Sequence, residues 1–95
     1  MKQKDSSTAV FIEMIAYLRH RLINARNTNN RDDLEDLKAT FTMLREASYE
    51  TKNKRLTEVL VNLEDSARDS IGGVLWKSDI PSEEAIKLAL QEETD

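Results

Sequence analysis

The sequence predicts an all-α protein, a small bundle of three main helices followed by a short C-terminal helix. Only two of its 95 residues are Gly and one is Pro, while 39% are hydrophobic and 34% are charged, which is typical of helix-rich chains. Apolar residues also recur at helical spacing along the chain. We expect one domain over 1–95, frayed at 1–6 and 93–95, with helices at about 7–26, 32–49, 54–71 and 82–92.

The first predicted helix carries a long apolar run, residues 9–23 with the sequence AVFIEMIAYLRHRLI. At helical spacing one stripe contains Phe11, Ile15, Leu18 and Leu22. Apolar residues flank this stripe on both sides, with Val10, Met14 and Tyr17 on one and Ile12, Ala16 and Ile23 on the other. An ordinary surface helix has an apolar arc of roughly 100°. Because this arc is wider, we expect the helix to be central to the bundle or shared with another chain, which predicts a homo-oligomer.

Two turns are expected to separate the first three helices. Residues 27–30 form the turn-forming sequence NTNN, and Asn30 or Asp32 is expected to cap the second helix. The core-facing stripe of that helix follows 3-4 heptad spacing through Leu34, Leu37, Phe41, Leu44 and Ser48. Beyond Ser48 the apolar pattern shifts by four residues, so either the chain turns back at 49–53 or one long helix continues through a stutter. We favour the hairpin, with Asn53 as its turn residue, because a small core needs elements that fold onto each other.

The segment after the third helix contains the only tryptophan of the chain. Gly72 and Gly73 predict the end of the third helix, because glycine accepts the left-handed conformation that satisfies the last carbonyl groups. Ser82 or Asp79 is expected to cap the last helix. Between these signals lies Trp76, which we interpret as a plug that closes the bundle. The alternative is an exposed anchor for a partner protein.

The net charge of −4 is distributed unevenly. Residues 1–30 hold five Lys or Arg against two Asp or Glu, residues 31–55 hold six against six, and residues 56–95 hold three against ten. The segments therefore carry +3, 0 and −7, and the ends are expected to attract each other. The expected contacts run from Arg19 and Arg26 to Glu64, Asp65 or Asp69. A second interpretation is an acidic surface directed at a basic partner protein.

Catalysis is not expected from this composition. The chain has no Cys and one His, so a thiolate nucleophile, a Ser-His-Asp triad and a zinc site with the usual ligands find no support. The two Gly residues are adjacent and no Lys-Ser or Lys-Thr pair follows them, which excludes a P-loop. Asp32, Asp33 and Asp36 suit the start of a helix better than a metal site. We therefore predict that the chain is not an enzyme and holds no metal or cofactor.

The same features bear on the location of the protein and on nucleic-acid binding. The absence of Cys favours the cytoplasm, and no apolar run approaches the roughly 18 residues of a membrane span. The basic start resembles a signal peptide, but the charges of Asp5, Glu13 and residues 19–21 argue against one. Nucleic-acid binding through Arg19, Arg21 and Arg26 is disfavoured because the chain is acidic and lacks a Lys/Arg-rich run.

One short motif points to a different function. His20 begins the string His20-Arg21-Leu22-Ile23-Asn24 on the first helix. This string resembles the phosphoacceptor helix of one class of sensor histidine kinases, whose core reads His-Arg-apolar-Lys-Asn. The resemblance covers five residues, with Ile23 where that family has lysine. It implies that His20 accepts a phosphoryl group in a signalling module, whereas the residues alone are consistent with a histidine exposed between two arginines.

The function that we expect from these features is protein binding. A small acidic intracellular chain without catalytic groups is typical of a regulator that occupies a partner protein, as an inhibitor, adaptor, antitoxin or chaperone does. The expected partner-binding or oligomer interface consists of Phe11, Ile15, Leu18, Leu22 and Trp76. The alternatives are the phosphoacceptor module based on His20 and nucleic-acid binding through the basic face of the first helix.

Overall fold

The computed structural model describes residues 6–73 and 79–91, without the side chains of residues 6–9 and 11. All regular structure in these residues is helical, which confirms the all-α class. The elements are α1 (Ser6–Thr28), α2 (Arg31–Ser48), the 3-10 turn η1 (Tyr49–Thr51), α3 (Lys54–Gly72) and α4 (Glu83–Gln91). These helix bounds lie within two residues of the predicted ones. Of the ends predicted to fray, only residue 6 is described, and it is the first residue of α1.

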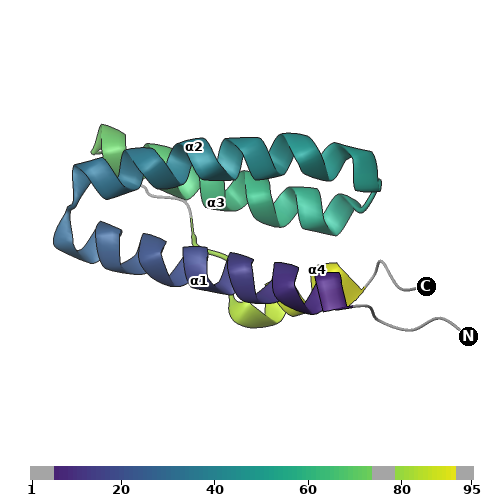
Figure 1. Ribbon diagram of the computed structural model, residues 1–95. Helices are drawn as coiled ribbons and strands as arrows, with labels where there is room; N and C mark the ends of the chain where they lie inside the picture. Colours follow the sequence, from purple (N-terminus) through teal and green to yellow (C-terminus); the bar gives the residue numbers. More distant parts are fainter. Residues whose placement is uncertain (1–5, 74–78, 92–95) are drawn as a thin grey trace, which may run out of the picture.

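The described helices pack side by side along one direction (Figure 1). α1 runs antiparallel to α2, and α2 and α3 form a second antiparallel pair with the most extensive contacts in the fold. α4 lies against α3 and against the N-terminal half of α1. Near the α2–α3 turn the bundle therefore includes α4 as well as α1, α2 and α3, whereas near the α1–α2 turn α4 is absent.

Two asparagines form the α1–α2 turn. Asn29 has a left-handed φ of 57°, a conformation that Asn adopts more readily than most residues with a side chain. Asn30 follows as the N-cap of α2, where its side-chain oxygen accepts a hydrogen bond from the amide of Asp33 at 3.2 Å. Of the two predicted caps, Asn30 is therefore the one that the fold uses.

The chain turns back between α2 and α3, which confirms the predicted hairpin over a single long helix. After η1, Lys52 takes a left-handed φ of 60°. Asn53 is the N-cap of α3, with its side-chain oxygen 3.1 Å from the amide nitrogen of Leu56. The side-chain amide of Asn53 also donates to the carbonyl of Ala89 at 2.6 Å. This one buried side chain thus starts α3 and ties the turn to α4.

The ends of α3 and α4 follow the predicted signals. Gly73 caps α3 with a φ of 67°, and its amide reaches the carbonyls of Asp69 and Ser70. Ser82 caps α4, because its hydroxyl oxygen accepts a hydrogen bond from the amide of Ala85 at 3.1 Å. Ser82 rather than Asp79 is therefore the cap of the last helix.

One hydrophobic cluster joins the four α-helices. Its buried members are Ile15, Leu18, Leu22 and Ala25 of α1, Leu34, Leu37 and Phe41 of α2, Leu56, Val59, Leu60, Leu63 and Ala67 of α3, and Ile86, Ala89 and Leu90 of α4. The predicted stripe of α1 thus faces the core wherever its side chains are described. The expectation that the first helix is central to the bundle is wrong for the single chain, because α1 packs less extensively against its neighbours than α3 does. Part of its wide apolar arc, including Val10 and Tyr17, is therefore exposed.

Candidate functional site

Exposed apolar side chains follow one side of α1. Val10, Met14 and Tyr17 are separated by four and three residues, so they share one face of the helix. The exposed fractions of Val10 and Tyr17 are 62% and 61%. These residues are the flank that the sequence pattern placed beside the buried stripe, and the described parts of the chain leave them accessible to a partner.

An ion pair joins α1 to α2 one turn beyond this flank. Arg21, one turn beyond Tyr17, hydrogen-bonds to Asp33 of α2, and this bond raises the pKa of Arg21. The guanidinium of Arg21 also lies 5.9 Å from the centre of the Tyr17 ring. On α2, Met43 is 66% exposed, and by helical periodicity its direction differs from that of Asp33 by roughly 80° around the helix axis. Val10, Met14, Tyr17 and Met43 are called the α1–α2 rim below.

The residues predicted to form the partner or oligomer interface do not lie on this rim. Ile15, Leu18 and Leu22 are buried in the core of the chain itself, so a partner could reach them only if α1 left the bundle. The side chain of Phe11 and the whole of Trp76 lie outside the described residues. The homo-oligomer stays a prediction, and the rim is one exposed apolar surface among the described residues that could form it.

The basic residues of α1 are engaged by other parts of the chain. Arg19 donates to the carbonyl of Pro81 at 2.7 Å and lies 3.8 Å from the carboxylate of Glu83. Arg26 donates to the hydroxyl of Ser66 at 3.0 Å. Because Arg21 binds Asp33, each of the three arginines binds a different part of the chain. This arrangement does not favour the continuous unpaired basic patch that nucleic-acid binding requires.

The predicted contacts of Arg19 and Arg26 with Glu64 or Asp65 are wrong. Glu64 instead pairs with Arg45, and Asp65 pairs with Arg68 within α3. Arg19 pairs with Glu83 because the start of α4 lies beside the middle of α1, a placement that the charge pattern alone does not define. Attraction between the basic first helix and the acidic last one is nevertheless present in that pair.

His20 lies on the exposed outer side of α1. Its ring makes no hydrogen bond or ion pair with the described residues, and its neighbour Leu22 points into the core. The phosphoacceptor interpretation therefore depends on the sequence resemblance alone and stays a prediction.

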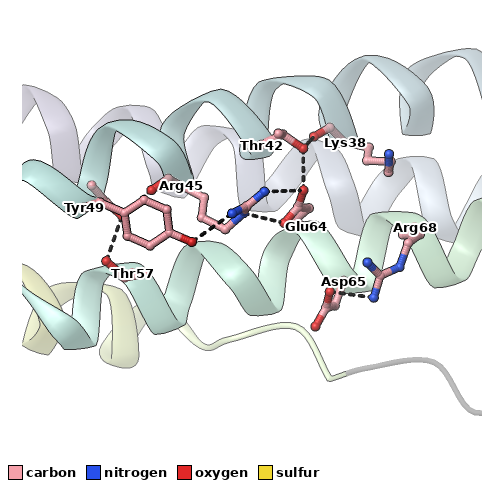
Figure 2. Close-up of polar contacts among 9 residues, drawn as sticks. Lys38, Thr42, Arg45, Tyr49, Thr57, Glu64, Asp65 and Arg68 are labelled. Carbon is pink, nitrogen blue, oxygen red and sulfur yellow. Dashed lines mark hydrogen bonds and ion pairs between the residues drawn. The ribbon is translucent and has the colours of Figure 1, made fainter.

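A polar cluster joins α2 to α3 (Figure 2). Arg45 donates from Nε to Glu64 Oε1 at 2.7 Å and from Nη2 to Oε2 at 3.4 Å, and Thr42 donates to Oε2. Burial raises the pKa of Glu64, but the hydrogen bonds from Thr42 and Arg45 outweigh it, so the pKa lies below the usual value. The bond to Glu64 is also the main cause of the raised pKa of Arg45.

The same arginine holds an exposed aromatic ring. Arg45 Nη1 donates to the hydroxyl of Tyr49 at 2.8 Å, and the guanidinium lies 5.9 Å from the ring centre (Figure 2). Nearby, the hydroxyl groups of Ser48 and Thr57 are 2.8 Å apart and link the end of α2 to α3. Tyr49 is therefore fixed at the surface by a contact that leads back to the Arg45–Glu64 pair.

A groove of about 600 Å³ opens beside Tyr49 at the α2–α3 turn. Its lining includes Tyr49, Lys52, Lys54, Thr57, Glu58 and Val61. The sequence predicted the turn but not this groove, since the groove depends on how α2 and α3 align. The only feature of the sequence that is related to this groove is the spacing of Arg45 and Tyr49, which lie one helical turn apart.

The described part of the chain offers neither a metal site nor a membrane span. It contains no group of three or more His, Cys, Asp or Glu side chains that could hold a metal ion. None of its helices is both long enough and apolar enough to cross a membrane. No protein-family model, curated protein or solved structure matches this chain, so its function must be inferred from the rim, the polar cluster and the groove.

Proposed function

We propose that this chain is a protein-binding regulator that acts by occupying a partner protein with its α1–α2 rim. The observation that carries this proposal is the exposure of Val10, Tyr17 and Met43, each accessible over more than 60% of its surface. Scattered exposed apolar residues are common, whereas several along one face of a helix, as Val10, Met14 and Tyr17 are on α1, are typical of binding surfaces. Tyr and Met are also enriched at the centres of protein interfaces.

The rim is supported by rigid elements. Its α1 residues alternate with the core residues Ile15 and Leu18, which anchor the helix to the bundle. Arg21 and Asp33 hold α1 beside α2 at the end of the rim. A surface that is fixed before binding loses less conformational entropy when the partner binds, which favours affinity.

The charges beside the rim suggest the chemistry of the partner. Glu13 precedes Tyr17 by one turn, and Asp36 and Glu46 lie within two turns of Met43 on α2. All three are exposed and none forms an ion pair within the described residues, although the charge of Asp36 helps to raise the pKa of Arg21. An apolar patch with unpaired carboxylates beside it suits a protein that presents apolar side chains near Lys or Arg. This matches the basic partner considered from the charge pattern.

A second copy of the chain is the other occupant that the rim could accept. The predicted homo-oligomer would bury the apolar flank of α1, as the wide apolar arc of that helix suggests. It would also bring carboxylates of both copies close together, which costs free energy. We therefore propose the basic partner protein first and the oligomer second.

The proposal is tested by affinity capture with matched variants in extracts of the organism that encodes the chain. Val10→Ser combined with Tyr17→Ser removes two rim side chains, and Leu88→Ser removes an apolar side chain on α4 that is 48% exposed. We expect the wild type and Leu88→Ser to retain the same protein, and the double variant to lose it. Equal retention by all three, with circular dichroism confirming that each is folded, would contradict the proposal. Sedimentation of the pure chain separately detects a second copy.

A further inference from the structure

The groove at the α2–α3 turn combines an apolar wall with a fixed shape. The ring of Tyr49 forms part of its lining together with Thr57 and Val61. Arg45 holds Tyr49 through the hydroxyl, and Glu64 in turn holds Arg45. The groove is therefore formed in the free protein, and it is large enough to receive one or two side chains of a peptide.

Two lysines without an ion-pair partner among the described residues line the groove. Lys52 and Lys54 are exposed and line the groove, and their ammonium groups make no ion pair or hydrogen bond with the described residues. By contrast, every described arginine has a partner. The lining contains one carboxylate, Glu58, which follows Lys54 by four residues but forms no ion pair with it.

The start of α3 adds to this positive character. α2 has Asp32 and Asp33 in its first turn and α4 has Glu83 and Glu84, where they oppose the positive end of the helix dipole. α3 has no acidic residue in its first turn. The positive end of its dipole is therefore not neutralised there, and it lies directly beside Lys52 and Lys54.

We infer that this groove binds an acidic peptide segment of a second protein, with an apolar side chain against Tyr49 and Val61 and carboxylates against Lys52 and Lys54. Charge complementarity selects this occupant, because two unpaired lysines lie at the edge of an apolar surface. A nucleic acid fits less well, since the chain has a net charge of −4 and Glu58 lies in the lining.

This inference is independent of the α1–α2 rim. The rim is formed by α1 and α2 and has carboxylates beside it, whereas the groove is formed by the α2–α3 turn and the first half of α3. A chain with both surfaces would join a partner with basic character to one with an acidic segment. Among the regulator types considered, that arrangement corresponds to an adaptor.

The test selects short random peptides, displayed on phage, for binding to the immobilised full chain. We expect enriched peptides to place an aromatic or aliphatic residue next to Asp or Glu. Fluorescence anisotropy with the best peptide then compares Lys54→Glu with Lys87→Glu, a reversal of equal size at an exposed lysine on α4. Lys54→Glu should weaken binding by about tenfold and Lys87→Glu by less than about twofold. Val61→Thr, which keeps the shape of the side chain, should also weaken it.

Several results would overturn the inference. They are the absence of any enriched peptide, enrichment of basic or uncharged peptides, and equal effects of Lys54→Glu and Lys87→Glu. Tighter binding of a single-stranded oligonucleotide than of the selected peptide would assign the groove to nucleic acid instead. The helical circular dichroism signal of each variant shows whether it is folded, so that lost binding is not confused with unfolding.

Discussion

Arg45 of α2 and Glu64 of α3 form an ion pair in which Nε and Oε1 are 2.7 Å apart. The exposed fractions of the two side chains are only 23% and 12%. Because Thr42 also donates to Glu64 and Arg45 also donates to Tyr49, this pair links the helix hairpin to the edge of the groove. It adds a polar contact to the apolar packing of α2 against α3, and it connects Tyr49 to that interface.

Glu64→Ala should lower the free energy of unfolding by about 1–3 kcal/mol, because it leaves Thr42 and Arg45 without their charged acceptor. Chemical denaturation followed by circular dichroism measures this loss. The matched control is Asp65→Ala at the next position of α3, whose pair with Arg68 is more exposed and should contribute less than about 0.5 kcal/mol. A loss for Glu64→Ala no larger than that for Asp65→Ala would show that the pair does not stabilise the hairpin.

The lowered pKa of Glu64 predicts a stability change in acid. A carboxyl group whose pKa is lower in the folded chain stabilises the fold above its unfolded pKa, near 4.3, and loses this contribution as pH falls through the folded pKa. Glu64→Gln has a similar shape but does not titrate. The difference in unfolding free energy between wild type and Glu64→Gln should be constant between about pH 5 and 7 and shrink below about pH 4. A difference that grows on acidification would contradict the direction of the pKa shift.

Asn53 should matter more than Asn30, although both cap a helix. Asn30→Ala removes one exposed cap and should cost about 1 kcal/mol. Asn53→Ala removes a buried cap and the bond to Ala89, so it should cost about 2–3 kcal/mol. Asn53→Asp, which keeps the accepting oxygen but loses the donor to Ala89, should fall between wild type and Asn53→Ala. Equal thermal stability of Asn30→Ala and Asn53→Ala would mean that the contact with α4 contributes nothing.

The sequence was sufficient to predict the helices because their signals are local. Asn30, Asn53 and Gly73 act at their own turns, and helical spacing alone assigned Ile15 and Leu22 to an apolar face that the structure places in the core. The sequence predicted an apolar flank beside the buried stripe of α1, but not that this flank is exposed, since burial depends on which helix lies beside α1.

The polar contacts were harder to predict because they join distant parts of the chain. Arg45 and Glu64 are nineteen residues apart, and nothing in their local sequence selects that pairing over the predicted one with Arg19 or Arg26. Arg19 bonds to the carbonyl of Pro81, sixty-two residues away, which no charge count can indicate. The groove was equally hard to predict, because its lining comes from the α2–α3 turn and the first half of α3, whose relative position depends on packing between distant parts of the chain.

Substitutions on the rim and in the core should affect stability differently. Tyr17→Ser and Met43→Ser change exposed side chains and should alter the free energy of unfolding by less than about 1 kcal/mol. Ile15→Ala and Leu22→Ala create cavities at fully buried positions and should each cost about 2–5 kcal/mol. Urea denaturation of the four variants tests this. Large losses for the rim variants would indicate that the rim is already covered in the free protein.

The central claim, that the α1–α2 rim occupies a partner protein, is tested most directly by photo-crosslinking in the organism that encodes the chain. A benzophenone amino acid replaces Tyr17 in one variant and Leu88 in another, so that both reporters are exposed but only one belongs to the rim. Irradiation should give an adduct with a different protein from position 17 and none from position 88. Adducts of equal yield from both positions, an adduct from position 17 that contains only a second copy of the chain, or no adduct from that position would contradict the claim.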